Sequence, residues 1–226
     1  MDNPNVSPAT IKSVLTSRGS VEVFTKLQAI RTALVVIDMQ NFFMEPGQML
    51  EMPAARAIVP NINLLATTLR KAGGTVAWVN MTLDEQALDA WSVFIPINGS
   101  TATRPTFASL QSNTHVHDLW PELQTEPSDL FVNKSRFSAF IEGSSNLKEL
   151  LDARNIDTLL VVGTLTNVCC ESTARDAMML NFRVVMVEDA NATFNEQAHR
   201  ATLDTFLMFF GDVRTTKDMV SLISRS

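Results

Sequence analysis

The chain has 226 residues, of which 46% are hydrophobic and 19% are charged, with a formal net charge of −6 and a pI of about 5.1. This composition predicts a folded domain with a sizeable core, and the lack of a basic cluster argues against nucleic-acid binding. No apolar run reaches the roughly 18 residues of a membrane span, and residues 1–20 lack a secretory-signal pattern, so we expect a cytoplasmic protein.

The two cysteines, Cys169 and Cys170, are adjacent in sequence. They cannot form a disulfide framework, which fits a reducing compartment. His115 and His117 could bind a metal only if a distant carboxylate joined them, and the alternative is a surface pair in a loop. The sequence therefore predicts no metal centre and no cofactor.

Residues 1–30 are polar at first and then mildly amphipathic. Val21, Phe24, Leu27 and Ile30 recur at helical spacing, which predicts an N-terminal arm with one or two helices. We expect this arm to pack on its own domain or on a neighbouring subunit.

Residues 31–226 alternate strand and helix patterns without a repeat or linker, which predicts a single domain. Strands are expected at 32–37, 75–80, 130–133, 158–162 and 183–187, with a short edge strand at 212–215. Helices are expected at 54–71, 147–155, 171–180, 196–209 and 217–223, and a loop at 42–52. This order predicts an α/β fold, namely three α/β/α layers around a mostly parallel, about six-stranded, Rossmann-like sheet. Residues 81–129 show no clear period, as is common for a lid or an interface, and are expected to shape either the substrate pocket or a subunit contact.

Three reactive side chains follow predicted strands at their carboxyl ends: Asp38, Lys134 and Cys169. Because parallel strands present these ends at one edge of the sheet, the three residues can share a pocket. A carboxylate base, an ammonium group and a thiol together suit nucleophilic attack on a carbonyl carbon. The alternative for Asp38 is a turn residue or a helix N-cap.

Cys169 lies where the fourth long strand gives way to a helix. A thiol at a helix N-terminus is favoured as the thiolate, so we expect its pKa to be lowered from ~8.5 toward ~3.5–7.5.

Four motifs in order carry a resemblance to a known family. They are VVIDMQNFF at 35–43, NKSRFSAF at 133–140, VGTLTNVCCESTARDA at 162–177 and EDANAT at 188–193. From about residue 32 to 211 the sequence resembles the isochorismatase-like cysteine hydrolases, which include nicotinamidases, N-carbamoylsarcosine amidases and ureidoacrylate amidohydrolases.

The resemblance implies the isochorismatase-like hydrolase fold and a catalytic triad of Asp38, Lys134 and Cys169. It aligns Cys169 as the nucleophile and leaves Cys170 as a small buried hydrophobe. It also implies a cis peptide bond at Thr164–Leu165, with an oxyanion hole formed by the N–H groups of Leu165 and Cys169. Family members are usually dimers or tetramers, so a homo-oligomer is expected.

The departures from the family pattern narrow the expected chemistry. Residues 39–80 contain no histidine, unlike the metal-dependent nicotinamidases, and the nucleophilic cysteine that isochorismatases lack is present. The resemblance therefore favours cleavage of an amide or ureido C–N bond in a small molecule, closest to the ureidoacrylate and carbamoyl amidohydrolases. Candidate substrate contacts, each with core packing as the alternative, are Phe43, Trp78, Asn80, Phe137 and Phe140. Two other functions stay open: hydrolysis of a vinyl ether, with Cys169 a bystander, and a non-catalytic binding or redox module that uses the cysteine pair.

Overall fold

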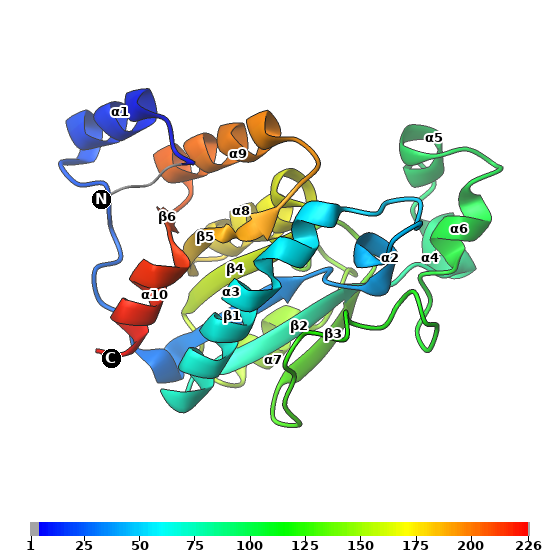
Figure 1. Ribbon diagram of the computed structural model, residues 1–226, viewed down its shortest axis with the longest axis horizontal. Coiled ribbons are helices and arrows are strands. Elements are labelled where there is room, and N and C mark those ends of the chain that lie inside the picture. Colours follow the sequence, from blue (N-terminus) through cyan, green and yellow to red (C-terminus); the bar gives the residue numbers. More distant parts are fainter. Residues whose placement is uncertain (1–4, 226) are drawn as a thin grey trace.

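The computed structural model describes residues 5–225, which build one six-stranded parallel sheet in the order β3-β2-β1-β4-β5-β6 (Figure 1). The strands are β1 (Thr32–Ile37), β2 (Thr75–Met81), β3 (Leu130–Lys134), β4 (Thr158–Thr164), β5 (Arg183–Ala192) and β6 (Asp212–Arg214). Every pairing is parallel, and β1 and β4 are buried along their whole length. Such continuous β-branched runs are typical of strands covered on both faces. The predicted α/β fold class is confirmed.

Helices cover both faces of the sheet (Figure 1). On one face α3 (Pro53–Lys71) contacts β1, β2, β4 and β5, and α10 (Thr216–Ile223) packs beside it. On the other lie α7 (Leu147–Asp152), α8 (Glu171–Met179) and α9 (Glu196–Phe209). The buried positions of α3 include Ile58, Ile62, Leu65 and Leu69, which recur every three or four residues and give the helix one apolar face.

The strand order reverses between β1 and β4, because β1 has β2 on one side and β4 on the other. Gly163, near the end of β4, has φ +114°, and a Cβ there would lie 2.2 Å from the carbonyl oxygen of Ile37. Only glycine allows the two strands to approach this closely. In open α/β sheets the crevice at such a reversal is where ligands bind.

The described part of the N-terminal arm contains one α-helix, within the predicted one or two, but not at the positions whose spacing predicted it. Helix α1 (Pro8–Arg18) is capped by Ser7 and packs against α9, but residues 20–28 form no helix. The N–H groups of Val23 and Phe24 instead donate to the Asp212 carboxylate, which holds this segment extended. The helical spacing at 21–30 was therefore misleading, and only a 3₁₀ turn (Ala29–Arg31) occurs there. Residues 1–4 of the predicted arm lie outside the described residues.

Two connections at the carboxyl edge of the sheet hold short helices. The predicted loop at 42–52 is wrong at its start, where α2 (Asn41–Met44) forms a single buried turn. Residues 82–129, here called the insert, contain α4 (Glu85–Ala90), α5 (Phe94–Asn98) and α6 (Arg104–Ala108), which lie beyond the carboxyl ends of the strands (Figure 1). Helices of five or six residues are too short to display a helical period, which explains why the sequence pattern was unreadable here.

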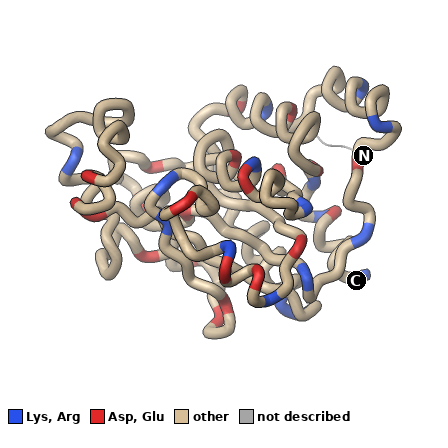
Figure 2. Tube along the Cα trace, turned by 180° about the vertical axis from the view of Figure 1, so that it is seen from behind, with Lys and Arg blue, Asp and Glu red and all other residues tan. Residues whose placement is uncertain are grey.

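Positively and negatively charged residues are interspersed along the Cα trace (Figure 2). Within residues 5–225 no helix has both the length and the apolar character that crossing a membrane requires.

Candidate active site

Asp38 directly follows β1 and begins the turn at the reversal point of the sheet. Its backbone adopts φ +51°, and its N–H donates to the carbonyl of Val79 at 2.9 Å. The left-handed region is uncommon for a residue other than glycine, and aspartate is among the residues that tolerate it. Asp38 is only 1% exposed, so its carboxylate is buried.

Lys134 is the last residue of β3 and is fully buried. Its Nζ donates to Oδ2 of Asp38 at 2.8 Å and to the carbonyl of Arg136 at 3.2 Å, and it passes the sulfur of Met81 at 3.9 Å. The long side chain thus reaches past the end of β2 to a residue at the end of β1. Asp38 and Lys134 form a buried, hydrogen-bonded ion pair.

Cys169 lies in a π-helical turn, Thr166–Cys170, between β4 and α8. Such turns are frequent at functional sites. The turn is tied to α9 by a 2.9 Å contact between Oγ1 of Thr166 and Nδ1 of His199. It is preceded by a cis peptide bond between Thr164 and Leu165. The sequence suggested that Cys169 lies at the start of a regular helix. The structure instead places it in the π-helical turn, and α8 begins only at Glu171.

The Cys169 thiol lies close enough to Asp38 and Lys134 for both groups to influence its pKa. Burial is the main cause of a raised pKa for this thiol, and the charge of Asp38 raises it further. The expectation of a lowered thiol pKa is therefore wrong, because burial and the charge of Asp38 together outweigh the lowering effect of Lys134. The thiol is therefore held in its neutral form, and nucleophilic attack by its sulfur would require a base.

Asp38 has the properties of that base. Burial raises the pKa of its carboxyl group, and Lys134 opposes this effect only in part. Its Oδ1 atom is fully buried and accepts no hydrogen bond of ordinary geometry from residues 5–225, whereas Oδ2 is occupied by Lys134. For Lys134 burial lowers the pKa, but the neighbouring Asp38 and Cys169 raise it more, so the ammonium form is kept.

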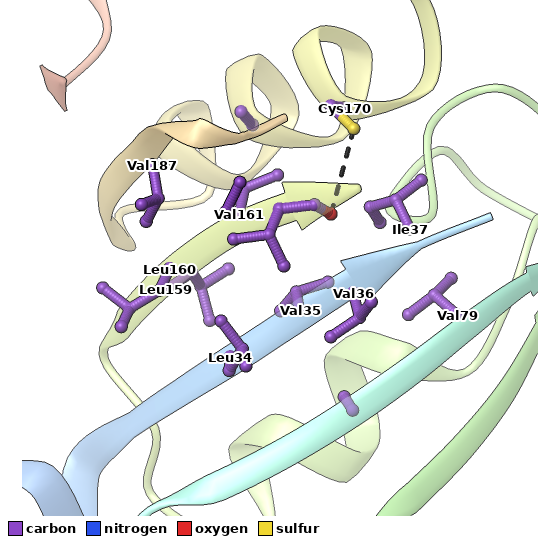
Figure 3. Close-up of a cluster of buried hydrophobic side chains, with 14 of the residues drawn as sticks. Leu34, Val35, Val36, Ile37, Val79, Leu159, Leu160, Val161, Cys170 and Val187 are labelled. Atoms are coloured by element: carbon purple, nitrogen blue, oxygen red, sulfur yellow. Dashed lines mark hydrogen bonds between the residues drawn. The ribbon is translucent and has the colours of Figure 1, made fainter. Parts of the chain in front are cut away.

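Cys170 occupies a different environment from Cys169. It is completely buried, and its Sγ faces the carbonyl of Val162 in β4 at 3.9 Å (Figure 3). Figure 3 draws it among the valines, leucines and isoleucines of the central strands. Its side chain therefore belongs to the core.

A cavity of about 180 Å³ opens onto Asp38 and Cys169, and Leu165 also lines it. Of the candidate substrate contacts, Phe43 and Phe137 line this cavity. The other three lie elsewhere, so the expectation of substrate contact is not met for them. The Trp78 indole is fully buried and donates to Asp129 at 2.8 Å, Asn80 donates to the carbonyl of His117 at 3.4 Å, and Phe140 packs on Phe182.

The sequence reading missed most of the cavity wall. Phe94, Asn98 and Phe107 come from α5 and α6 of the insert, while Phe42 and Phe194 come from α2 and the segment before α9. Residues 81–129 thus contribute several side chains to this cavity, but no period or motif there singled them out. The one available signal was the aromatic content of the insert.

The two histidines considered as metal ligands have separate partners. Nε2 of His115 lies 2.9 Å from Glu45, and Nε2 of His117 lies 2.8 Å from the hydroxyl of Thr82. Across residues 5–225 there is no group of three or more His, Cys, Asp or Glu side chains arranged to hold a metal ion. The donor set of a zinc site is therefore missing from this part of the chain.

Comparison with known proteins identifies the family of this chain. Among solved structures, a cysteine hydrolase from Pseudomonas syringae pv. phaseolicola 1448A has a TM-score of 0.75 at 28% identity, over 88% of this chain and 95% of that chain. N-carbamoylsarcosine amidase from Thermoplasma acidophilum has a TM-score of 0.67 at 26% identity, over 82% and 96%. Pyrazinamidase of Pyrococcus horikoshii, solved in complex with zinc, has a TM-score of 0.69 at 21% identity, over 82% and 99%, and is a likeness of fold alone. The sequence model of the isochorismatase domain matches residues 32–218, and the chain therefore belongs to the isochorismatase-like hydrolase family.

Proposed function

We propose that the protein is a cysteine-dependent amidohydrolase that cleaves an amide or ureido C–N bond of a small molecule through a thioester. The observation that carries the proposal is that Asp38 and Cys169 line one cavity, with the buried Lys134 paired to Asp38 behind them. The likeness to a cysteine hydrolase and to an N-carbamoylsarcosine amidase supports the same chemistry.

In the first step the free Oδ1 of Asp38 takes the proton of the Cys169 thiol as sulfur attacks the substrate carbonyl carbon. The raised pKa of Asp38 suits this transfer, since a base is most effective when its pKa approaches the working pH. Lys134 stabilises the thiolate as it forms, because its ammonium charge lies beside both groups. The backbone N–H groups of Leu165 and Cys169 are assigned to the tetrahedral oxyanion.

In the second step Asp38 returns the proton to the departing ammonia or amine, and the carbonyl re-forms as a thioester on Cys169. A water molecule then enters, Asp38 removes its proton, and the thioester is hydrolysed to a carboxylic acid and free thiol. Because the described residues hold no metal-ligand cluster, every step is assigned to the chain's own groups. Assembly as a homo-oligomer stays a prediction.

The test is ammonia release from a panel of small amides by the wild type and by Cys169→Ala and Cys170→Ala, run side by side. The proposal expects release by the wild type and by Cys170→Ala, and a loss of at least about 10³-fold in Cys169→Ala. Activity that survives Cys169→Ala would favour the vinyl-ether chemistry. Reversible oxidation of the cysteine pair, with no ammonia from any amide, would favour a redox module.

A further inference from the structure

The walls of the cavity above Cys169 are unusually rich in aromatic rings. Six phenylalanines line it: Phe42, Phe43, Phe94, Phe107, Phe137 and Phe194. Aliphatic side chains fill most of the remaining wall, and Asn98 is the one neutral amide. The lining therefore offers contact to hydrocarbon surface and very few hydrogen bonds.

The aromatic wall is held together by its own ring contacts. Phe107 meets Phe94 edge to face with ring centres 5.0 Å apart, and it meets Phe42 at 6.4 Å. Phe94 meets Phe137 at 6.0 Å, so rings from α2, the insert and the segment after β3 form one connected surface. Edge-to-face and tilted pairs at these distances are favourable, which gives the wall a fixed shape before substrate enters.

Among the described residues, no positively charged side chain lines the cavity to pair with an anionic substrate. Asp38 is the only charged residue among the described residues that line it. The one cation beside it, Lys134, is already paired with Asp38, and transfer of the thiol proton to Asp38 leaves the sum of the three groups unchanged. A substrate carboxylate held in the inner part of the cavity, away from the exposed Phe194, would therefore lie among phenylalanines without a partner, which is strongly unfavourable.

The two arginines next to the cavity walls are engaged elsewhere. The Arg104 guanidinium is paired with Glu85 and Asp89 in the insert. The Arg136 guanidinium lies over the Trp91 ring and donates to backbone carbonyls. Neither residue lines the cavity.

We infer that the acyl group of the substrate is a neutral hydrocarbon, either a single aromatic ring or a branched chain of similar size. This inference rests on the proposed amidohydrolase function and names its substrate class. The volume of about 180 Å³ is suitable, since cavities of about 150 Å³ accept benzene. A hydrocarbon acyl group narrows the proposed amide or ureido bond to an amide, and it disfavours ureidoacrylate, which carries a carboxylate.

The test uses amides that share a shape but differ in charge. In 4-methylpentanamide an isopropyl group stands where succinamate has a carboxylate, and benzamide supplies the aromatic case. Ammonia release is measured for all three with the wild-type enzyme. The inference expects kcat/KM for the neutral amides to exceed that for succinamate by at least about 100-fold.

A pair of variants tests the cause of the selectivity. Phe194 lines the cavity and is 58% exposed, so Phe194→Arg can add a cation at the wall with little risk to folding. Its expected effect is a gain in kcat/KM for succinamate relative to 4-methylpentanamide. Phe209→Arg is the matched control, because Phe209 is similarly exposed, at 66%, and lies outside the cavity.

The outcomes separate the two claims. Equal or preferred turnover of succinamate by the wild type would overturn the substrate class and leave the amidohydrolase function standing. An unchanged preference in Phe194→Arg would overturn the argument from wall charge. Absence of ammonia from all three amides, with no acyl group found on Cys169, would overturn both the substrate class and the proposed function.

Discussion

Nζ of Lys134 lies 2.8 Å from Oδ2 of Asp38, and both side chains are at most 1% exposed. The two residues come from β3 and from the end of β1, which are not neighbours in the sheet. An ion pair removed from water persists only when each charge has its partner, so the fold and the chemistry of this site are linked.

Lys134→Met should destabilise the protein by about 3–5 kcal/mol, because it leaves the Asp38 carboxylate buried without its cation. The double variant Asp38→Asn/Lys134→Met removes both charges and should recover much of that loss. Urea unfolding of the wild type, both single variants and the double variant closes a thermodynamic cycle. Strictly additive effects of the two single changes would show that the pair is not coupled.

The pH dependence of turnover should report the state of Asp38. The proposed base must be deprotonated, and its carboxyl pKa is raised from 3.8. The acid limb of kcat/KM is therefore expected at a pH clearly above 3.8, with activity lost as pH falls through it. Measurement of kcat/KM from about pH 3 to 9 on a neutral amide checks this expectation, and an acid limb centred at or below 3.8 would argue against Asp38 as the base.

Glu188 should make folding stability depend on pH. Burial is the main cause that raises its carboxyl pKa from 4.5 to about 7, and its Oε1 atom has no hydrogen-bond partner in residues 5–225. The folded state then binds the proton more tightly than the unfolded state, so this contribution is present below pH 4.5 and lost as pH rises to 7. The loss is of the order of 2–3 kcal/mol.

Glu188→Gln should remove this dependence, because glutamine stays neutral. The free energy of unfolding, measured between pH 4 and 8, should fall less steeply toward high pH in the variant than in the wild type. Glu142→Gln, at an exposed position, is the control. Parallel curves for the wild type and Glu188→Gln would contradict the raised pKa.

The sequence predicted those parts of the fold in which a local pattern and the tertiary environment agree. The strands at 32–37 and 158–162 are apolar because both of their faces are covered, and α3 has an apolar stripe because one face meets the sheet. The segment at 21–30 had a helical period but lies extended, since its backbone N–H groups bond to Asp212, about 190 residues later in the chain. A long-range contact of this kind leaves no local signal.

The candidate site likewise has features that the sequence could predict and features that it could not. Asp38, Lys134 and Cys169 could be grouped because each follows a strand, and parallel strands end at one edge. The protonation state of Cys169 could not be predicted, because it depends on burial by segments distant in sequence. Trp78 lies in the fully buried central part of β2, and its indole N–H donates to Asp129. The cavity wall depends on short helices of the insert, whose positions are set by ring packing.

The measurement that tests the central claim most directly is intact-mass analysis of enzyme mixed with a neutral amide and quenched in acid within milliseconds to seconds. Wild type and Cys170→Ala should both gain the mass of one acyl group, and Cys169→Ala should gain none. An acyl group on Cys169→Ala, or its loss in Cys170→Ala alone, would contradict the assignment of Cys169 as the nucleophile.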